Sequence, residues 1–476
     1  MTPQEIAAIG VARLGLPVPM AKLVTIQSIA RALGQEATAE IFAEALVEWI
    51  ETRELESECL EALCPLLAAI TPKPAVVARI RRAISRPSLA SDLMLSLATG
   101  YPIVLTSWSG CHSGPAPQLL MLDKEEQALR AGTFIPPLFT HNLEDLQERS
   151  GRSFLRQWAF EYKVLSERSG RKGDGHLDYF LGDERSNVGQ FVARKGHLAR
   201  SAYLRTLACA VERWDMPEDL AQHYATDTFP AEPIFLRLAL QAPPFWAPAV
   251  HRRKAAEIVD AQALAHSVIQ CVEQQQQRVM HCSLTIVDEP LCHSELEIFA
   301  IVQTHNDLDP KRAIGFYRHL LGKATSLRIG LRSFASPQMG NEDTALLKFV
   351  PILLPLIGPS IGYLQSDFIG RVPYLPVSTN NVPNIELIPG LDGAVLRSME
   401  KEIGTWNGWL WNWKPSHARD WSAPIAWHVG LQCQAAQQIA DDLGGRIAHV
   451  WSLTTWQRDQ PYGEWRQVEQ VGRINT

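Results

Sequence analysis

The chain is 476 residues long, with 46% hydrophobic residues, 20% charged residues and a net charge of −6. This composition is ordinary for a soluble globular protein, and the length predicts two or three domains, because single cores stop growing near about 250 to 300 residues. The acidic balance argues against a general nucleic-acid binder, which usually carries a basic surplus.

The cysteines and the first residues indicate a reducing compartment. The eight cysteines are scattered and include no Cys-x-x-Cys pair, and the segment Met1–Glu5 lacks the basic and apolar regions of a signal peptide. We therefore expect reduced thiols in a cytoplasm. Arginine outnumbers lysine 33 to 12 and alanine and leucine are abundant, which indicates a GC-rich bacterial genome.

Residues 1–98 are predicted to form a stack of helices. Thr2-Pro3-Gln4-Glu5 is a capping box with proline at the first helical position, and apolar residues then recur with a 3.6-residue period. Helices of about 15 residues with short breaks favour an irregular array of the HEAT or armadillo kind, which usually binds other proteins. The alternative is a plain helical bundle that covers the next domain.

Residues 99–248 are predicted to form a mostly helical middle domain. A short strand over Tyr101–Trp108 precedes helical stretches over 116–165 and 187–225. The segment 149–205 carries 12 basic against 6 acidic residues, so this stretch is +6 and the rest of the chain sums to −12. This stretch could serve an anionic partner. The favoured interpretation is that it docks on an acidic neighbouring domain or is a solvated surface.

Residues 249–476 are predicted to form an α+β domain. We expect a helix over 254–274 and a second helix over 424–442, and Asp309 before Pro310 is typical of a helix N-cap. Two β-hairpins are predicted, and their strands cover Val279–Val287 with Glu295–Val302, and Ile447–Thr455 with Glu464–Val471. The fold class is therefore a multidomain α+β protein.

The final segment is rich in tryptophan, with nine of the 14 tryptophans between Trp406 and Trp465. Trp409, Trp411 and Trp413 would share one face of a strand, where they could stack on sugars, bases or a partner's aromatic side chains. The alternative is that most of them pack in the core under the helix predicted over 424–442. We expect most to be buried and two or three to be exposed as interface residues.

Two polar segments contain residue types used in hydrolases. Cys111-His112 follows a short apolar strand within a glycine-rich turn, so Cys111 is a candidate nucleophile, although an adjacent histidine is usually badly oriented as its base. Asp174, His176 and Asp178 resemble divalent-metal ligands but match no spacing motif. A solvated polar loop is the favoured interpretation of this acidic loop, 174–184. The nearby Arg168, Arg171 and Lys172 could contact phosphate, and a solvated basic surface explains them equally well.

Two histidine–cysteine pairs occur on the first predicted hairpin, His281-Cys282 and Cys292-His293. Zinc prefers such ligands, but strand alternation puts both cysteines in the core phase and both histidines in the outer phase. The expectation is therefore buried cysteines and exposed histidines, without a metal or another cofactor.

The segment Phe349–Leu364 is uncharged and strongly apolar. Three prolines interrupt it, so it is too short and too broken for an ordinary transmembrane helix. Buried connecting segments are the main interpretation. A membrane-active segment released by cleavage near residues 166–176 is the alternative.

The sequence as a whole favours a non-catalytic protein–protein interaction component: an adaptor, regulator or substrate subunit of a bacterial multi-component system, with antiviral defence or stress response as a specific version. The partner would be another protein, bound by the helical array or by the Trp-rich half. A cysteine- or metal-dependent hydrolase and a proteolytically released membrane-active effector are the alternatives.

Overall fold

The computed structural model describes most of the chain in two compact units; among the described residues, the first covers those up to Arg237 and the second those from Leu238 on. The three-domain division expected from the sequence stays a prediction. The described residues are 1–16, 19–69, 73–103, 110–131, 137–169, 194–231, 233–238, 241–252, 254–303, 309–315, 317, 354–355, 374–375, 385–390, 393–410, 425–461 and 463–475.

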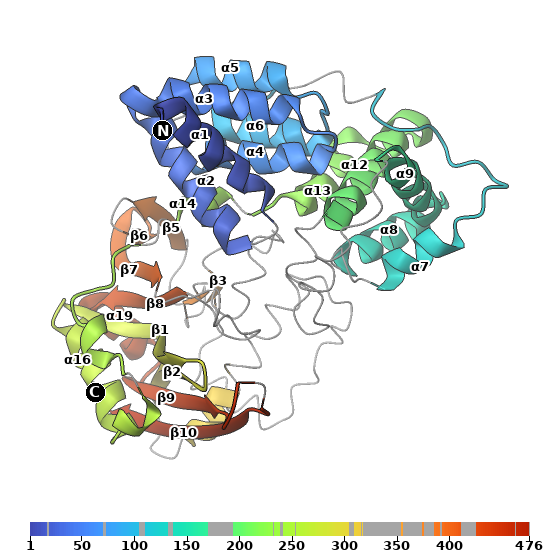
Figure 1. The fold of residues 1–476 in the computed structure, drawn as a ribbon. Helices are drawn as coiled ribbons and strands as arrows, with labels where there is room; N and C mark the ends of the chain where they lie inside the picture. The colour runs from blue at the N-terminus through green and yellow to red at the C-terminus, as the bar shows by residue number, and fades with distance from the viewer. Residues whose placement is uncertain are drawn as a thin grey trace. The chain divides into compact units, whose positions relative to one another are not determined.

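The first unit begins with packed helices (Figure 1). Helix α1 packs on α3, α3 packs on α2 and α5, and α4 packs on α2 and α6. The predicted capping box is confirmed, since Thr2 Oγ1 accepts from the amide of Glu5 and Glu5 accepts from the amide of Thr2. These helices are α1 (Pro3–Ala12), α2 (Pro19–Gly34), α3 (Glu36–Glu51), α4 (Glu56–Ala68), α5 (Pro74–Ala83) and α6 (Leu89–Thr99), with a 3-10 turn η1 at Arg13–Gly15.

The remainder of the first unit is also helical, as the sequence predicts. Helix α12 (Arg194–Trp214) packs on both α4 and α9, and 15 consecutive residues of it are buried. A helix of this length with no solvated face is the centre of its unit. The other elements of this part are α7 (Asp123–Ala131), α8 (Pro137–Ser150), α9 (Phe154–Arg168), α13 (Glu218–Ala225), η3 (Thr226–Thr228) and α14 (Pro233–Arg237).

The second unit is built on an antiparallel sheet of eight described strands, in the order β10-β9-β2-β1-β8-β7-β6-β5. Both predicted hairpins are confirmed, because β1 pairs with β2 and β9 pairs with β10. The strands are β1 (Gln277–Glu289), β2 (Cys292–Gln303), β5 (Ile385–Gly390), β6 (Gly393–Ser398), β7 (Lys401–Leu410), β8 (Ile425–Gln432), β9 (Arg446–Gln457) and β10 (Arg466–Asn475), with a separate short pair β3 (Leu354–Pro355) and β4 (Tyr374–Leu375).

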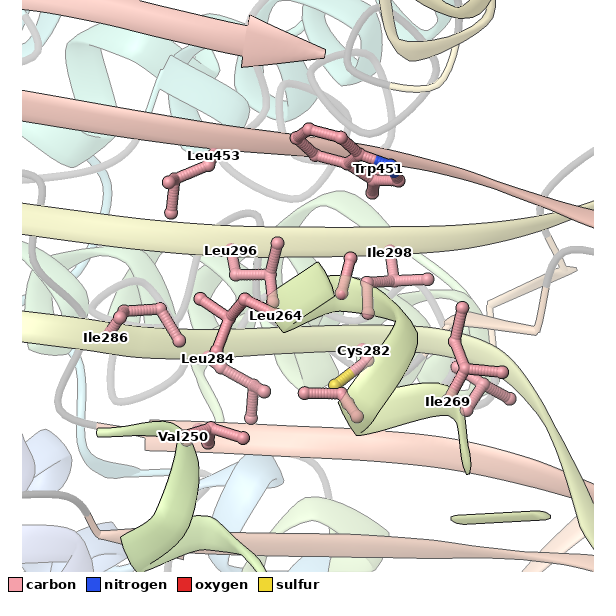
Figure 2. Packing of buried hydrophobic residues seen from close by; sticks show 14 of the residues in the cluster. Val250, Leu264, Ile269, Cys282, Leu284, Ile286, Leu296, Ile298, Trp451 and Leu453 are labelled. Atoms are coloured by element: carbon pink, nitrogen blue, oxygen red, sulfur yellow. The ribbon is translucent and has the colours of Figure 1, made fainter. Parts of the chain in front are cut away.

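One face of the sheet is covered by helix α16 (Ala261–Glu273), preceded by α15 (Ala247–Val250) and the 3-10 turn η4 (Ala255–Glu257). Figure 2 shows Leu264 and Ile269 of this helix over Cys282, Leu284 and Ile298. Cys282 thus lies in the core phase, as the alternation predicts.

The opposite face of the sheet is also covered around its central strands. Phe299 lies on this face and stacks on Tyr317, with ring centroids 4.5 Å apart, and the Tyr317 hydroxyl donates to the carbonyl of Ala300 at 2.7 Å. His281 stacks on Phe299 on the same face. Strands covered on both faces hold few solvated side chains, so β1 is buried along most of its length.

The helix expected over 424–442 is wrong in its first half. Residues Ile425–Gln432 form β8, which pairs with β1 and β7, and only Cys433–Asp442 form a helix, α19. Apolar residues at Ile425 and Val429 fit a helical period, but the run Ile425–Val429 also suits a strand buried on both faces. Tertiary pairing decides between the two.

The architecture is therefore a helical region followed by an antiparallel sheet with helices, an α+β protein. Within the described part of the chain, no helix is both long enough and apolar enough to cross a membrane. The apolar segment Phe349–Leu364 and most of the strand predicted over Tyr101–Trp108 lie outside the described residues.

Candidate functional site

The structure describes only some of the residues that the sequence singles out. Cys111, His112, Arg168, His281 and His293 are described, as is Trp409. The candidates that lie outside the described residues are Asp174, His176, Asp178, Arg171, Lys172, Trp411 and Trp413.

The ring of His112 is held by two neighbours in the first unit. Its Nε2 lies 2.7 Å from Oε2 of Glu212 on α12, and its Nδ1 accepts from the amide of Gly114 at 2.9 Å. A ring whose Nδ1 accepts carries its proton on Nε2, which then donates to Glu212. Both nitrogens are thus engaged, and His112 acts here as a brace for the turn that follows Cys111.

Cys111 is half-buried near the ion pair of Glu56 and Arg205. Burial raises the pKa of the Cys111 thiol, and the negative charge of Glu56 raises it further, against the opposing effect of Arg205. The thiolate is the nucleophilic form, so the described surroundings of Cys111 keep it in the less reactive thiol form.

A loop after Cys111, Ser113–Met121, is held against helix α9 by polar side chains; we call it the clamped loop. Glu161 accepts from the Ser113 amide at 2.7 Å and from the Ser113 hydroxyl at 2.9 Å. Gln157 donates to the Gly114 carbonyl and accepts from the Ala116 amide, both at 2.8 Å. Each bond fixes main chain that would otherwise be solvated and mobile.

The tip of the clamped loop is fixed by one guanidinium group. Nη2 of Arg156 lies 2.8 Å from the carbonyl oxygen of Pro117 and 2.7 Å from those of Gln118 and Leu120. Arg156 and Gln157 lie in one turn of α9 and Glu161 lies in the next, so one helix holds the loop. Sequence reasoning assigned this segment to helix or connector, because nothing local marks the distant residues that clamp it.

The clamped loop presents two large apolar side chains to solvent. Leu119 is 98% exposed and Met121 is 73% exposed, while Leu122 directly after them is buried and fixes the end of the loop. Single exposed apolar residues are common on protein surfaces. This pair differs from such residues because Arg156 already holds the carbonyls of Pro117, Gln118 and Leu120, so the two side chains project from a fixed backbone.

A buried polar network joins α2, α4 and α12 in the first unit. Oγ of Ser57 lies 3.0 Å from Nδ1 of His197, whose Nε2 lies 3.4 Å from Oε1 of Glu61. Lys22 donates to Glu61 and to the carbonyl of Leu14, and Arg200 donates to Ser57 at 2.9 Å.

The order serine, histidine, glutamate in this network is the order of a hydrolase triad. Ser57 is wholly buried, however, and its oxygen already accepts from Arg200. Burial lowers the pKa of His197 well below its ordinary value, and the positive charge of Arg200 lowers it further. The network therefore fixes α12 against α4 and offers no exposed nucleophile.

The basic segment 149–205 contributes three arginines to contacts with α4 and the residues just before it. Arg205 pairs with Glu56 at 2.7 Å, Arg194 pairs with Glu54, which precedes α4, at 2.9 Å, and Arg200 contacts Ser57. Arg194 and Arg205 therefore pair with carboxylates of their own unit. For these three side chains the positive charge is used inside the protein. Arg168, in the last turn of α9, belongs to the same segment.

The two candidate zinc histidines lie on the face expected from strand alternation but are not exposed. His281 and His293 are each 1% exposed, so the expectation of exposed histidines is wrong, because the sheet is covered on both faces. His293 lies between two carboxylates, with Nδ1 3.3 Å from Asp288 and Nε2 2.8 Å from Glu295. No group of metal-ligating side chains is found among the described residues.

The described tryptophans of the final segment mostly pack in the core. Trp409 is buried and meets Trp246 edge-to-face at 5.7 Å, on the face that α16 covers. Trp427 is buried on the opposite face, where its ring meets His281 at 4.4 Å. Trp406 and Trp451 are buried too, whereas Trp456 and Trp465 are partly exposed. Trp409 therefore belongs to the core and offers no binding surface.

No family model matches the chain, and no curated protein sequence matches it significantly.

Proposed function

We propose that this protein is a non-catalytic interaction component that binds a partner protein through the clamped loop. The observation that carries the proposal is the Arg156 guanidinium, which donates to the carbonyl oxygens of Pro117, Gln118 and Leu120 in the loop that exposes Leu119 and Met121. Apolar anchors on a rigid support bind with a small entropic cost, since little order has to be imposed on binding.

The charge beside the loop indicates what the partner's surface must offer. The first turn of α7 follows directly and carries Asp123, Glu125 and Glu126. A complementary surface would therefore hold an apolar pocket for Leu119 and Met121 with basic side chains at its rim. Opposite charges at a rim mainly accelerate association, while the buried anchors determine the affinity.

The first helix of the unit supports a second contact region. Ile6 and Ile9 are 51% and 55% exposed on α1, and Leu16 after η1 is also exposed. The terminal repeats of a helical array normally have a polar outer face, so apolar residues exposed on a terminal helix indicate a contact surface. An irregular HEAT- or armadillo-like array with α1 at its end remains our interpretation of residues 1–98.

Affinity purification of the intact protein from its native host, with quantitative mass spectrometry, tests the proposal. The wild type should recover a partner in stoichiometric amount, and the double variant Leu119→Asp/Met121→Asp should lose it. Val259→Asp is the matched control, because Val259 is 94% exposed but lies in the second unit. Recovery of the same partner by the double variant, or of no partner by the wild type, would overturn the proposal.

A further inference from the structure

The last strand of the chain forms one edge of the eight-stranded sheet. Strand β10 is the first in the strand order, and among the described strands only β9 pairs with it. That pairing runs through ten consecutive residue pairs, Arg466–Asn475 against Ala448–Gln457, without a shift of register. Among the described strands none pairs with the outer side of β10, and the amide and carbonyl groups of such a straight, regular strand are a template for another strand.

Natural proteins usually protect such an edge with proline, charged side chains or a bulge. The segment 466–475 contains no proline, its pairing contains no bulge, and its charged side chains are Arg466, Glu469 and Arg473. Its first five residues are all exposed, including Val468 at 60%. At Gly472 the Trp451 ring lies so close to the backbone that an added Cβ would be 2.4 Å from it, so a larger residue would clash with the ring.

The sequence of β10 is complementary to itself when read antiparallel about Val471. Glu469 then lies opposite Arg473, and Val468 lies opposite Ile474. A two-fold axis normal to the sheet produces each of these pairs twice. The remaining pairs are Gln467 with Asn475 and Gln470 with Gly472, so the overlap covers residues 467–475.

Neighbouring registers lack this complementarity. A two-fold axis normal to the sheet keeps each face of the sheet on the same side in both copies. Residues that lie opposite each other must then point to the same face, so the axis passes through a residue and not between two residues. Centred on Gln470, the pairing sets Arg473 opposite Gln467 and Glu469 opposite Val471. Centred on Gly472, it sets Arg473 opposite Val471 and Glu469 opposite Asn475. Only the Val471 register joins opposite charges and apolar side chains together.

We propose that β10 pairs with β10 of a second copy of this chain, antiparallel and centred on Val471, so that two sheets become one continuous sheet. Nine residue pairs in an antiparallel ladder exchange about eight to ten hydrogen bonds between main chains. The addition of a strand at an open edge is an established mode of protein association. This pairing uses the second unit and is independent of the clamped loop.

Sedimentation velocity of the full-length chain tests the association and its charges. The wild type should form a dimer, and Glu469→Arg should weaken it about tenfold or more, because two attractive pairs become repulsive. Arg473→Glu should do the same, and the double variant Glu469→Arg/Arg473→Glu should restore the wild-type affinity. A monomeric wild type, or a dimer that ignores both reversals, would overturn the proposal.

A cysteine scan tests the register separately. Val471→Cys places two cysteines directly opposite each other, within the reach of a disulfide, so mild oxidation should give a covalent dimer on a non-reducing gel. Val468→Cys is the matched control, because its mate lies six residues, about 20 Å, along the strand. If circular dichroism shows that both variants are folded, cross-linking at position 468 and not at position 471 would refute this register.

Discussion

The ion pair between Glu56 and Arg205 connects α4 to α12 at a distance of 2.7 Å, although the two residues are 149 positions apart in the chain. Both side chains are buried, and one carboxylate oxygen of Glu56, Oε2, has no hydrogen-bond partner. The carboxylate therefore depends on Arg205 for nearly all its compensation, which makes this contact sensitive to substitution.

Replacing Arg205 with methionine should destabilise the first unit by about 3 to 5 kcal/mol, because it leaves an uncompensated charge in the interior. The double variant Glu56→Leu/Arg205→Met should recover most of this loss, since an apolar pair needs no compensation. Urea unfolding followed by far-ultraviolet circular dichroism measures both. A single variant within about 1 kcal/mol of wild type would show that the pair is not needed.

The sheet should lose stability in acid because of two buried histidines. Burial lowers the pKa of both His428 and His449 to about 4, and Nε2 of His449 lies 2.9 Å from the carbonyl oxygen of Val279. Each ring binds a proton near pH 6.5 when the chain is unfolded, so the free energy of unfolding should fall between about pH 6.5 and 4, by about 3 kcal/mol per histidine.

His449→Gln tests this pH dependence, because glutamine can keep the bond to Val279 but cannot titrate. The free energy of unfolding of the variant, relative to that of the wild type, should increase as the pH falls from 7 towards 4. Tryptophan fluorescence during urea unfolding reports on this sheet, where Trp409 and Trp451 are buried. Parallel pH profiles for variant and wild type would contradict the assignment.

Asp227 in the first unit should have the opposite dependence. Burial raises the pKa of its carboxyl to about 6, although the Asn142 side chain donates to it at 2.7 Å. The folded state then binds the proton more tightly than the unfolded state, so this group stabilises the fold at low pH. Its contribution of about 3 kcal/mol should disappear as the pH rises from about 4 to 6.

Asp227→Asn should remove that contribution while it keeps an acceptor for Asn142. The variant should therefore gain stability relative to wild type as the pH rises from 4 to above 6, and should stay constant relative to it at higher pH. Chemical unfolding at half-unit pH intervals measures the difference. An unchanged difference across this range would exclude Asp227 as the titrating group.

Removing the Arg156 guanidinium should release the tip of the clamped loop without unfolding the unit. We expect Arg156→Ala to accelerate hydrogen exchange at the Leu120 amide, which donates to the carbonyl of Pro117 at 3.3 Å in the folded chain. Affinity for the proposed partner should fall about tenfold, as each freed side chain must be ordered again on binding. Arg152→Ala, at an exposed site before α9, is the control and should change neither quantity.

Local patterns were sufficient to predict most helices and both hairpins. The Thr2–Glu5 capping box and the alternation around Cys282 each depend on residues within a few positions of each other. The same local patterns gave a helix for Ile425–Gln432, where apolar spacing fits two periods and pairing with β1 and β7 decides.

The candidate site was beyond the reach of sequence reasoning because its contacts are distant. Arg156 reaches carbonyls 36 to 39 positions away, and His197 reaches Ser57 across 140 positions. Arginine and histidine give no periodic signal of such partners. The burial of His281 and His293 was also missed, since alternation tells which face a residue occupies but not what covers that face.

The strand order also determines when the sheet can be completed during synthesis. The hairpin of β1 and β2 ends at Gln303, but β2 needs β9, which ends at Gln457, and β1 needs β8. At ribosomal rates the intervening chain takes on the order of ten seconds to emerge. During that interval both edges of the hairpin of β1 and β2 are unpaired, so the nascent chain exposes apolar strands to which chaperones can bind.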